Sequence, residues 1–176
     1  MKQIIIILFS VLILYKTSYS QSIGLTLGGG FFSGNSPNVS AFTSSLFVNS
    51  PPVFNDAFSL RLSFFYDADY NVLLPNSTNQ YNPFIKGLSL KGIITQHMDP
   101  IYYVEEGMGA LVINDRIFSG IDATDYGIII SFGVGIDLRK NSTRGFLIGA
   151  GTDYSFTVTN SYAKYFSIYI MGHYFF

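Results

Sequence analysis

Apolar and polar residues alternate with a period of two along most of the chain, a pattern that predicts β-strands. The alternation is clearest in Asp125–Leu138, where every second residue from Tyr126 onward is apolar. The residues between them are small or polar, with Ile129 as the exception. The same division predicts further strands, which are Ser22–Phe32, Ala57–Asp67, Gly145–Val158 and Tyr165–Phe176.

Three more segments have a less regular alternation and are predicted as strands as well. They are Phe84–His97, Ile101–Ile113 and, with the weakest pattern, Asn38–Asn49. The total is then even, as a closed up-and-down barrel in a bacterial outer membrane requires. The sequence therefore predicts an all-β fold, an eight-stranded antiparallel up-and-down β-barrel, and the transmembrane character of this barrel follows from the polar faces of its strands.

The polar faces of these strands indicate which solvent surrounds the barrel. They carry mostly Gly, Ser, Ala and Thr, and charged residues make up only 12% of the chain. A water-facing surface is normally about a quarter to a third charged. We therefore expect the apolar faces to point outward into lipid, where the sheet must close because open edges leave backbone groups unpaired. The isolated charges then form an interior network in which cations pair with carboxylates, namely Arg61 and Lys91 with Glu105, Asp137 and Asp153.

The predicted connections alternate between the two ends of the barrel, as they do in this class of protein. The long connections are expected outside the cell and the short turns on the periplasmic side. The predicted inner turns are Ser50–Asn55, His97–Pro100 and Arg139–Thr143. The predicted outer loops are Phe32–Pro37, Ala68–Tyr81, Asn114–Ala123 and Thr159–Lys164. The second and third are the longest connections in the chain, whereas the first and last are short, so the agreement with this class is partial.

The N-terminal segment has the features of a secretory signal peptide. Lys2 precedes the apolar run Ile4–Tyr15, and Ser18-Tyr19-Ser20 offers small residues for cleavage before Gln21. The alternative is an uncleaved membrane anchor. As a helix, however, the run is about 18 Å long, and the hydrocarbon core is roughly 30 Å thick. We therefore expect a cleaved signal peptide at residues 1–20 and an outer-membrane β-barrel domain at residues 21–176.

Four segments together resemble a known family. GLSLKGIITQHMDPIYYVEEGMGALV, TDYGIIISFGVGIDL and FLIGAGTDYSFTVTN occur in that order before the terminal SIYIMGHYFF. This order is similar to the PorT-type, OmpX-like family of small outer-membrane β-barrel proteins of diderm bacteria. The resemblance covers most of Gln21–Phe176. It departs from the family at Asp153-Tyr154, where members often show Arg-Tyr, and at Ser63-Phe64, where they often show Glu-Leu.

The resemblance implies an eight-stranded barrel in the outer membrane, with no single reaction attached to it. Some members of the family serve protein-secretion and gliding machinery. An accessory role in a secretion or surface-assembly system is therefore what the resemblance implies for this chain.

The terminal strand carries the sharpest functional hypothesis. Barrel-assembly machinery recognises a last strand with alternating aromatic or apolar positions that ends in Phe. An alternative explanation for the same pattern is simple exposure to membrane lipid. The residues that meet the description are Phe176, Tyr174, Ile170 and Ile168.

No cofactor or metal is expected. The chain has no Cys, and its two histidines, His97 and His173, have no neighbouring ligands at a spacing that suggests the three or four convergent ligands of a metal site. Neither histidine falls in a predicted outer loop, where a lipid-modifying enzyme would place a Ser-His-carboxylate group. We expect both to be satisfied polar residues. The protein is therefore predicted not to be an enzyme.

One residue conflicts with the alternation. Glu106 belongs to a face that is otherwise apolar, and strict alternation points its carboxylate toward lipid. A bulge at Glu105-Glu106 would remove this conflict. So would a position close to the periplasmic interface of the outer membrane.

The function that follows is a structural or binding role for an integral outer-membrane barrel. Its expected partners are outer-membrane lipid, the barrel-assembly machinery and a protein bound by the outer loops Ala68–Tyr81 and Asn114–Ala123. With a net charge of −1 it has no basic surface for nucleic acid, and we expect a monomer. Two alternatives stay open: a secreted, soluble, lipocalin-like barrel that binds an apolar ligand, and an outer-membrane lipid-modifying enzyme.

Overall fold

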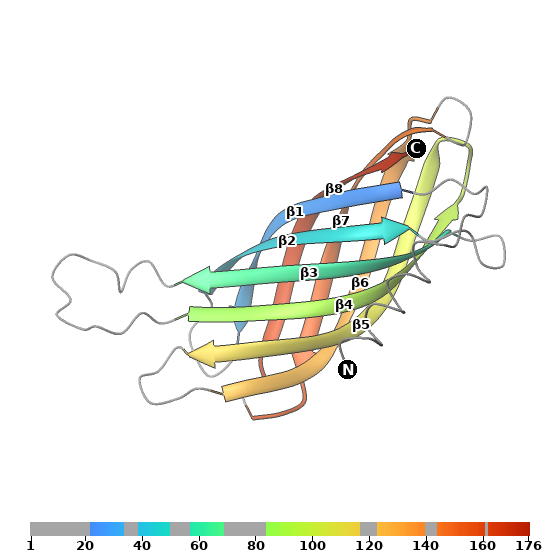
Figure 1. Ribbon diagram of the computed structural model, residues 1–176. Coiled ribbons are helices and arrows are strands. Elements are labelled where there is room, and N and C mark those ends of the chain that lie inside the picture. Colours follow the sequence, from blue (N-terminus) through green and yellow to red (C-terminus); the bar gives the residue numbers. More distant parts are fainter. Residues whose placement is uncertain are drawn as a thin grey trace, which may run out of the picture.

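The protein folds as a closed barrel of eight strands (Figure 1). The computed structural model describes residues 22–33, 39–49, 57–68, 84–116, 123–139, 144–160 and 162–176. Each strand pairs antiparallel with the next in sequence order, and β8 closes the ring on β1. The strands are β1 (Ser22–Ser33), β2 (Val39–Asn49), β3 (Ala57–Ala68), β4 (Phe84–His97), β5 (Tyr102–Arg116), β6 (Ala123–Asp137), β7 (Gly145–Thr157) and β8 (Lys164–Phe175). The predicted up-and-down barrel is thus confirmed.

The strand boundaries follow the alternation closely, with one clear extension. β4 has the bounds that the sequence predicts, and the weakly patterned segment at Asn38–Asn49 does form β2. β5 continues past the predicted end at Ile113, because the backbone ladder persists to the pair Phe84 and Arg116. The predicted signal peptide at residues 1–20 and the predicted turn at residues 50–55 lie outside the described residues.

The barrel has two distinct ends. At the turn end, β1 begins, β8 finishes, and a short turn joins β4 to β5 through a hydrogen bond from the Met98 N–H to the Tyr102 carbonyl (3.0 Å). The opposite end, called the loop end below, holds Ser33, Phe84 and Arg116. Figure 1 shows the turn end at the upper right and the loop end at the left. No helix in the described part of the chain is long and apolar enough to cross a membrane.

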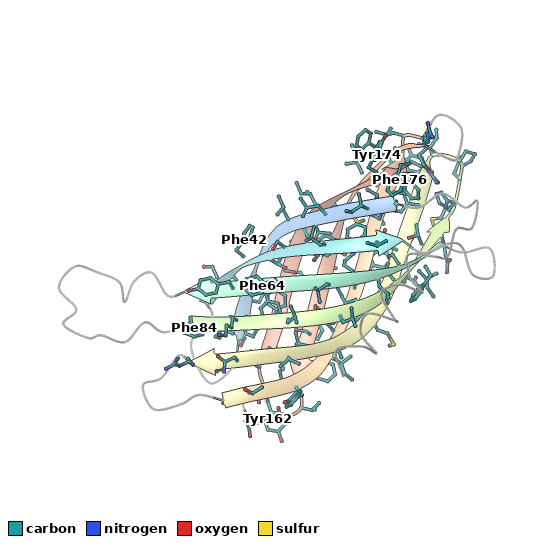
Figure 2. All side chains as sticks on the ribbon, in the orientation of Figure 1. Phe42, Phe64, Phe84, Tyr162, Tyr174 and Phe176 are labelled. Atoms are coloured by element: carbon teal, nitrogen blue, oxygen red, sulfur yellow. The ribbon has the colours of Figure 1, made fainter. Side chains whose placement is uncertain are left out.

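The outer surface of the barrel wall is apolar. Its side chains project from the wall on all sides, as Phe42 and Phe64 do in Figure 2. Several are more than half exposed, and soluble monomeric proteins rarely expose a continuous apolar surface of this kind. The exposed apolar side chains include Ile23, Leu25, Phe42, Leu46, Val48, Leu60, Leu88, Leu90, Ile128, Ile130, Phe132, Ile148, Ile168 and Ile170.

The interior holds many large side chains, unlike the small-residue interior that the sequence predicts. Phe65, Ile129 and Leu147 look like exceptions to the alternation, but each obeys it, points inward and is 1% exposed. The reason is volume, because the lumen of an eight-stranded barrel is just wide enough to be filled by side chains. The buried apolar clusters are Phe32, Ala41, Phe65, Ile85, Leu111, Ile113, Ala163 and Tyr165, and separately Tyr103, Leu147, Tyr169, Met171 and Phe175.

Glycines provide the space for these rings. Gly24 is the cross-strand partner of Phe47, and a side chain at Gly24 would overlap the Phe47 ring. Gly87 stands in the same relation to Phe65 on the neighbouring pair of strands. An aromatic ring that covers a cross-strand glycine is a known device for holding strand register.

Candidate functional site

The most strongly charged part of the barrel is its interior. Arg61 on β3 and Lys91 on β4 are direct cross-strand neighbours, and both side chains are fully buried. Two like charges in this position repel each other unless each has a counter-charge. Glu105 on β5 lies 2.8 Å from Arg61, and Asp153 on β7 lies 2.5 Å from Lys91. The structure thus brings four of the five predicted network residues together as two ion pairs.

Neighbouring side chains add further contacts to these pairs. The Ser131 hydroxyl donates to Asp153, and the Thr95 hydroxyl donates to Glu105 at 3.4 Å. The Arg61 guanidinium lies 4.2 Å from the centre of the Phe47 ring, within the range of a cation–π contact. Tyr169 accepts from Arg61 at 3.4 Å. Because buried charges are costly unless they are paired and hydrogen-bonded, these contacts keep the network stable inside the barrel.

His173 borders the network without a hydrogen bond of its own. Its Nε2 atom lies 3.2 Å from Glu105 Oε1, but neither ring nitrogen has a well-aligned hydrogen-bond partner among the described residues. The ring packs edge-on against Phe47, with centroids 4.4 Å apart, and stacks with Phe175. His173 thus has the Glu105 carboxylate as its polar partner, through a contact without ideal hydrogen-bond alignment, and ring packing holds it in place.

Asp137 does not belong to the interior network. It ends β6 at the turn end, where Arg139 is closer than either interior cation. The two side chains lie 2.5 Å apart, and His97 Nε2 lies 3.1 Å from the same carboxylate. The expected pairing of Asp137 with Arg61 or Lys91 is wrong, because alternation fixes the face of a residue but not its height along the barrel.

The turn-end group also holds the last strand in place. The Arg139 guanidinium lies 4.4 Å from the centre of the Phe175 ring, so one side chain links the β6–β7 connection to β8. An open depression of about 660 Å³ is lined here by residues that include Met98 and Pro100. No three His, Asp or Glu residues in the described ranges come close enough to hold a metal ion.

Three of the residues predicted as an assembly signal lie on the outer face of β8, and the fourth, Phe176, directly follows its last residue. Figure 2 shows Tyr174 and Phe176 at the turn end of the barrel. Their exposed fractions run from 43% to 67%, so they are available to lipid and to other proteins alike. The four residues are Ile168, Ile170, Tyr174 and Phe176.

Glu106 points outward, as strict alternation predicts. The pairing of β5 with both neighbours runs through this position without a break, so the predicted bulge at Glu105-Glu106 is wrong. Its cross-strand partners are Ile94 and Phe132, both exposed on the outer face. The carboxylate thus stands among apolar groups, and its distance from a membrane interface stays a prediction.

A group of aromatic and basic residues lies on the outer face at the loop end, and sequence reasoning missed it. The Lys86 ammonium lies 5.2 Å and the Arg116 guanidinium 5.6 Å from the centre of the Phe84 ring. Tyr66 stacks against the same ring, with centroids 6.4 Å apart. These residues come from three strands, and only the register places Phe84 opposite Arg116. The end of β5 beyond Ile113 was predicted as loop, which hid the pairing.

Comparison with known proteins supports the fold. No family model matches the chain, and neither does any curated protein. Among solved structures, Neisserial surface protein A has a TM-score of 0.58 at 10% identity, covering 88% of this chain and 96% of its own. The Yersinia pestis attachment invasion locus protein Ail, in complex with the heparin analogue sucrose octasulfate, has a TM-score of 0.63 at 13% identity, covering 90% of this chain and 99% of its own.

A second structure of Ail, without that ligand in its description, has a TM-score of 0.60 at 12% identity. It covers 91% of this chain and all of its own, 100%. At such identities the likeness concerns the fold. The chain therefore has the fold of a small outer-membrane β-barrel, while the narrower PorT-type resemblance stays a prediction.

Proposed function

We propose that this chain is an integral outer-membrane β-barrel protein that acts by binding through its loop end and catalyses no reaction. The observation that carries the proposal is the apolar outer wall of a closed barrel. Leu46 and Ile170, on different strands, are 63% and 67% exposed. Burying such groups in lipid releases roughly 25 cal/mol for each Å² of apolar surface removed from water.

The barrel interior argues against the soluble, lipocalin-like alternative. A lipocalin keeps an apolar cavity for its ligand and a polar surface toward water. Here the relation is reversed, because Arg61, Lys91 and Glu105 are buried inside while the outer wall is apolar. The same filled interior disfavours a wide pore, since the ion pairs and the aromatic clusters occupy the lumen.

The orientation follows from the two ends. In barrels of this class the termini and the short turns face the periplasm, and the longer loops face the exterior. The turn end would then be periplasmic, and the loop end would present residues 69–83 and 117–122 outside the cell. A signal peptide would carry the chain across the inner membrane, and the outer face of β8 would then engage the assembly machinery.

Binding by the outer loops is the role that this arrangement favours. The filled barrel acts as a rigid support, and loops on such a support commonly carry function. The PorT-type resemblance extends this to an accessory role in a secretion or surface-assembly system. We expect the barrel to act as a monomer.

Fractionation with heat-modifiable electrophoresis tests the proposal. We expect the chain in the outer-membrane fraction, released only by detergent, and migrating differently with and without heating because the closed barrel resists unfolding. A chain recovered in the soluble periplasmic or extracellular fraction without detergent, with no change in mobility on heating, contradicts the proposal and supports the soluble barrel.

A further inference from the structure

At the loop end, basic and acidic side chains lie on different faces of the barrel wall. Among the loop-end residues whose side chains the structure describes, Lys86, Arg116 and Lys164 are exposed on the outer wall, whereas Asp115 and Asp125 are buried within the barrel. The outer face of this rim is therefore basic, although the chain as a whole has a net charge of −1. A basic rim on the apolar wall matches an anionic layer at that height.

Two of these cations share one aromatic ring. Lys86 and Arg116 both lie within 5.6 Å of the Phe84 centroid, and Tyr66 stacks on the same ring from the other neighbouring strand. The Phe84 ring thus gathers two cationic side chains from neighbouring strands at one place on the rim. An arginine fork together with a lysine is also a recurring pair for holding phosphate oxygens.

The position of Lys86 and Arg116 along the barrel wall indicates that the anion is a lipid headgroup. The next outward residue after Lys86 on β4 is Leu88, 49% exposed, and the outer face of β5 becomes apolar at Val112. The cations thus stand at the edge of the apolar belt, which in the proposed orientation is the level of the lipid headgroups. Aromatic residues at this level are typical of the interfacial girdle of membrane barrels.

We propose that Lys86 and Arg116 bind the phosphate of an anionic outer-leaflet lipid, with Phe84 and Tyr66 against the junction of its headgroup and acyl chains. This site rests on the proposed function, since it requires the loop end to face the outer leaflet. The lysine stem extends along apolar surface while its ammonium reaches the headgroup layer. The occupant is a membrane glycolipid or phospholipid with an exposed phosphate, and not free phosphate.

Native mass spectrometry of the chain, purified from membranes in a non-ionic detergent, tests this site. The probes are lipid A with its two phosphates, the same lipid A with the phosphates removed, and inorganic phosphate. The test variant is Lys86→Gln/Arg116→Gln. The matched control is Lys164→Gln, which removes a cation of the same rim on the opposite wall of the barrel.

We expect wild type and Lys164→Gln to bind phosphorylated lipid A alike. The double variant should bind it roughly 25-fold more weakly, at about fivefold for each cation near an anionic lipid surface. Dephosphorylated lipid A should bind weakly and equally to all three. Equal affinity of the double variant and wild type for phosphorylated lipid A overturns the proposal. So does competition by inorganic phosphate at millimolar concentration, because it would identify a free anion as the occupant.

Each sample is first checked by heat-modifiable mobility, which separates the two hypotheses. A wild-type chain that never forms a detergent-stable barrel contradicts the proposed function. A folded barrel with no preference for phosphorylated lipid contradicts only the lipid site. If the double variant fails to fold, Lys86→Gln alone takes its place, with an expected loss of about fivefold; an affinity equal to wild type then overturns the site.

Discussion

The Nζ atom of Lys91 on β4 lies 2.5 Å from Oδ2 of Asp153 on β7, across the interior of the barrel. These strands are not neighbours in the sheet, so the pair links opposite parts of the wall. The second pair, Arg61 with Glu105, lies beside it. A closed sheet that surrounds two buried ion pairs is a filled support, and its surface chemistry is confined to the outer wall and the two rims.

Removing one partner of the Lys91–Asp153 pair should destabilise the barrel strongly. Lys91→Met leaves the Asp153 carboxylate buried without its counter-charge, and breaking a buried pair in this way costs about 3–5 kcal/mol. Urea unfolding in lipid vesicles, followed by heat-modifiable mobility, measures the loss in the free energy of unfolding.

The double variant Lys91→Met/Asp153→Leu is the control for this prediction. Replacing both charges with apolar groups of similar size is often neutral, so most of the lost stability should return. If the double variant is less stable than Lys91→Met alone, the unpaired Asp153 carboxylate is not the cause of the lost stability, and the prediction is wrong.

Gly109→Ala should destabilise the barrel because no space exists for a side chain there. Gly109 is the cross-strand partner of Lys91, and an added Cβ would lie 2.7 Å from the Lys91 Cα atom and closer still to the Leu90 carbonyl. Backbone must move to make room, at a cost of about 1–3 kcal/mol. The comparison is with Gly172→Ala, where nothing lies within 4 Å of the added carbon. Equal stability of the two variants in urea unfolding would be the contrary result.

The wall of this barrel could be predicted from the sequence, and its interior only in part. Strict alternation in segments such as Asp125–Leu138 identifies the outward face, because lipid demands apolar groups at every exposed position. Inward-facing positions accept small, aromatic and charged residues alike, so residue type alone does not identify them. Phe65 fits inside only because Gly87 is opposite, and that relation depends on strand register rather than on residue type.

The position of each residue along the barrel axis could not be predicted from the sequence either. Asp137 and Asp153 share an inward-facing pattern, but one lies at the turn end with Arg139 and the other reaches Lys91. The basic group around Phe84 was missed for the same reason, because only the register of three paired strands brings its residues into contact.

Glu106→Leu should stabilise the barrel in lipid vesicles. The carboxylate stands among outward apolar groups and has no ion-pair partner in the described part of the chain. An acidic residue on the lipid face costs less than the 2–4 kcal/mol of a basic one, so we expect a gain of up to about 2 kcal/mol. Met108→Leu, at the next outward position, should change stability by about 0.5 kcal/mol or less. A loss of stability in Glu106→Leu would indicate that the carboxylate has a partner in the membrane.

Phe176→Ala should impair assembly in the cell without impairing the folded barrel. If β8 is recognised by the assembly machinery, the amount of heat-modifiable protein in the outer membrane should fall severalfold. The control is Phe146→Ala on β7, because Phe146 is 55% exposed against 56% for Phe176 and packs against Tyr174 at 4.9 Å. Both substitutions remove similar apolar area from the turn-end wall, so their direct effects on stability should match. Refolding of each purified chain into detergent micelles should therefore be alike. An equal loss of both variants from the outer membrane would assign Phe176 to lipid contact alone and remove the recognition role from β8.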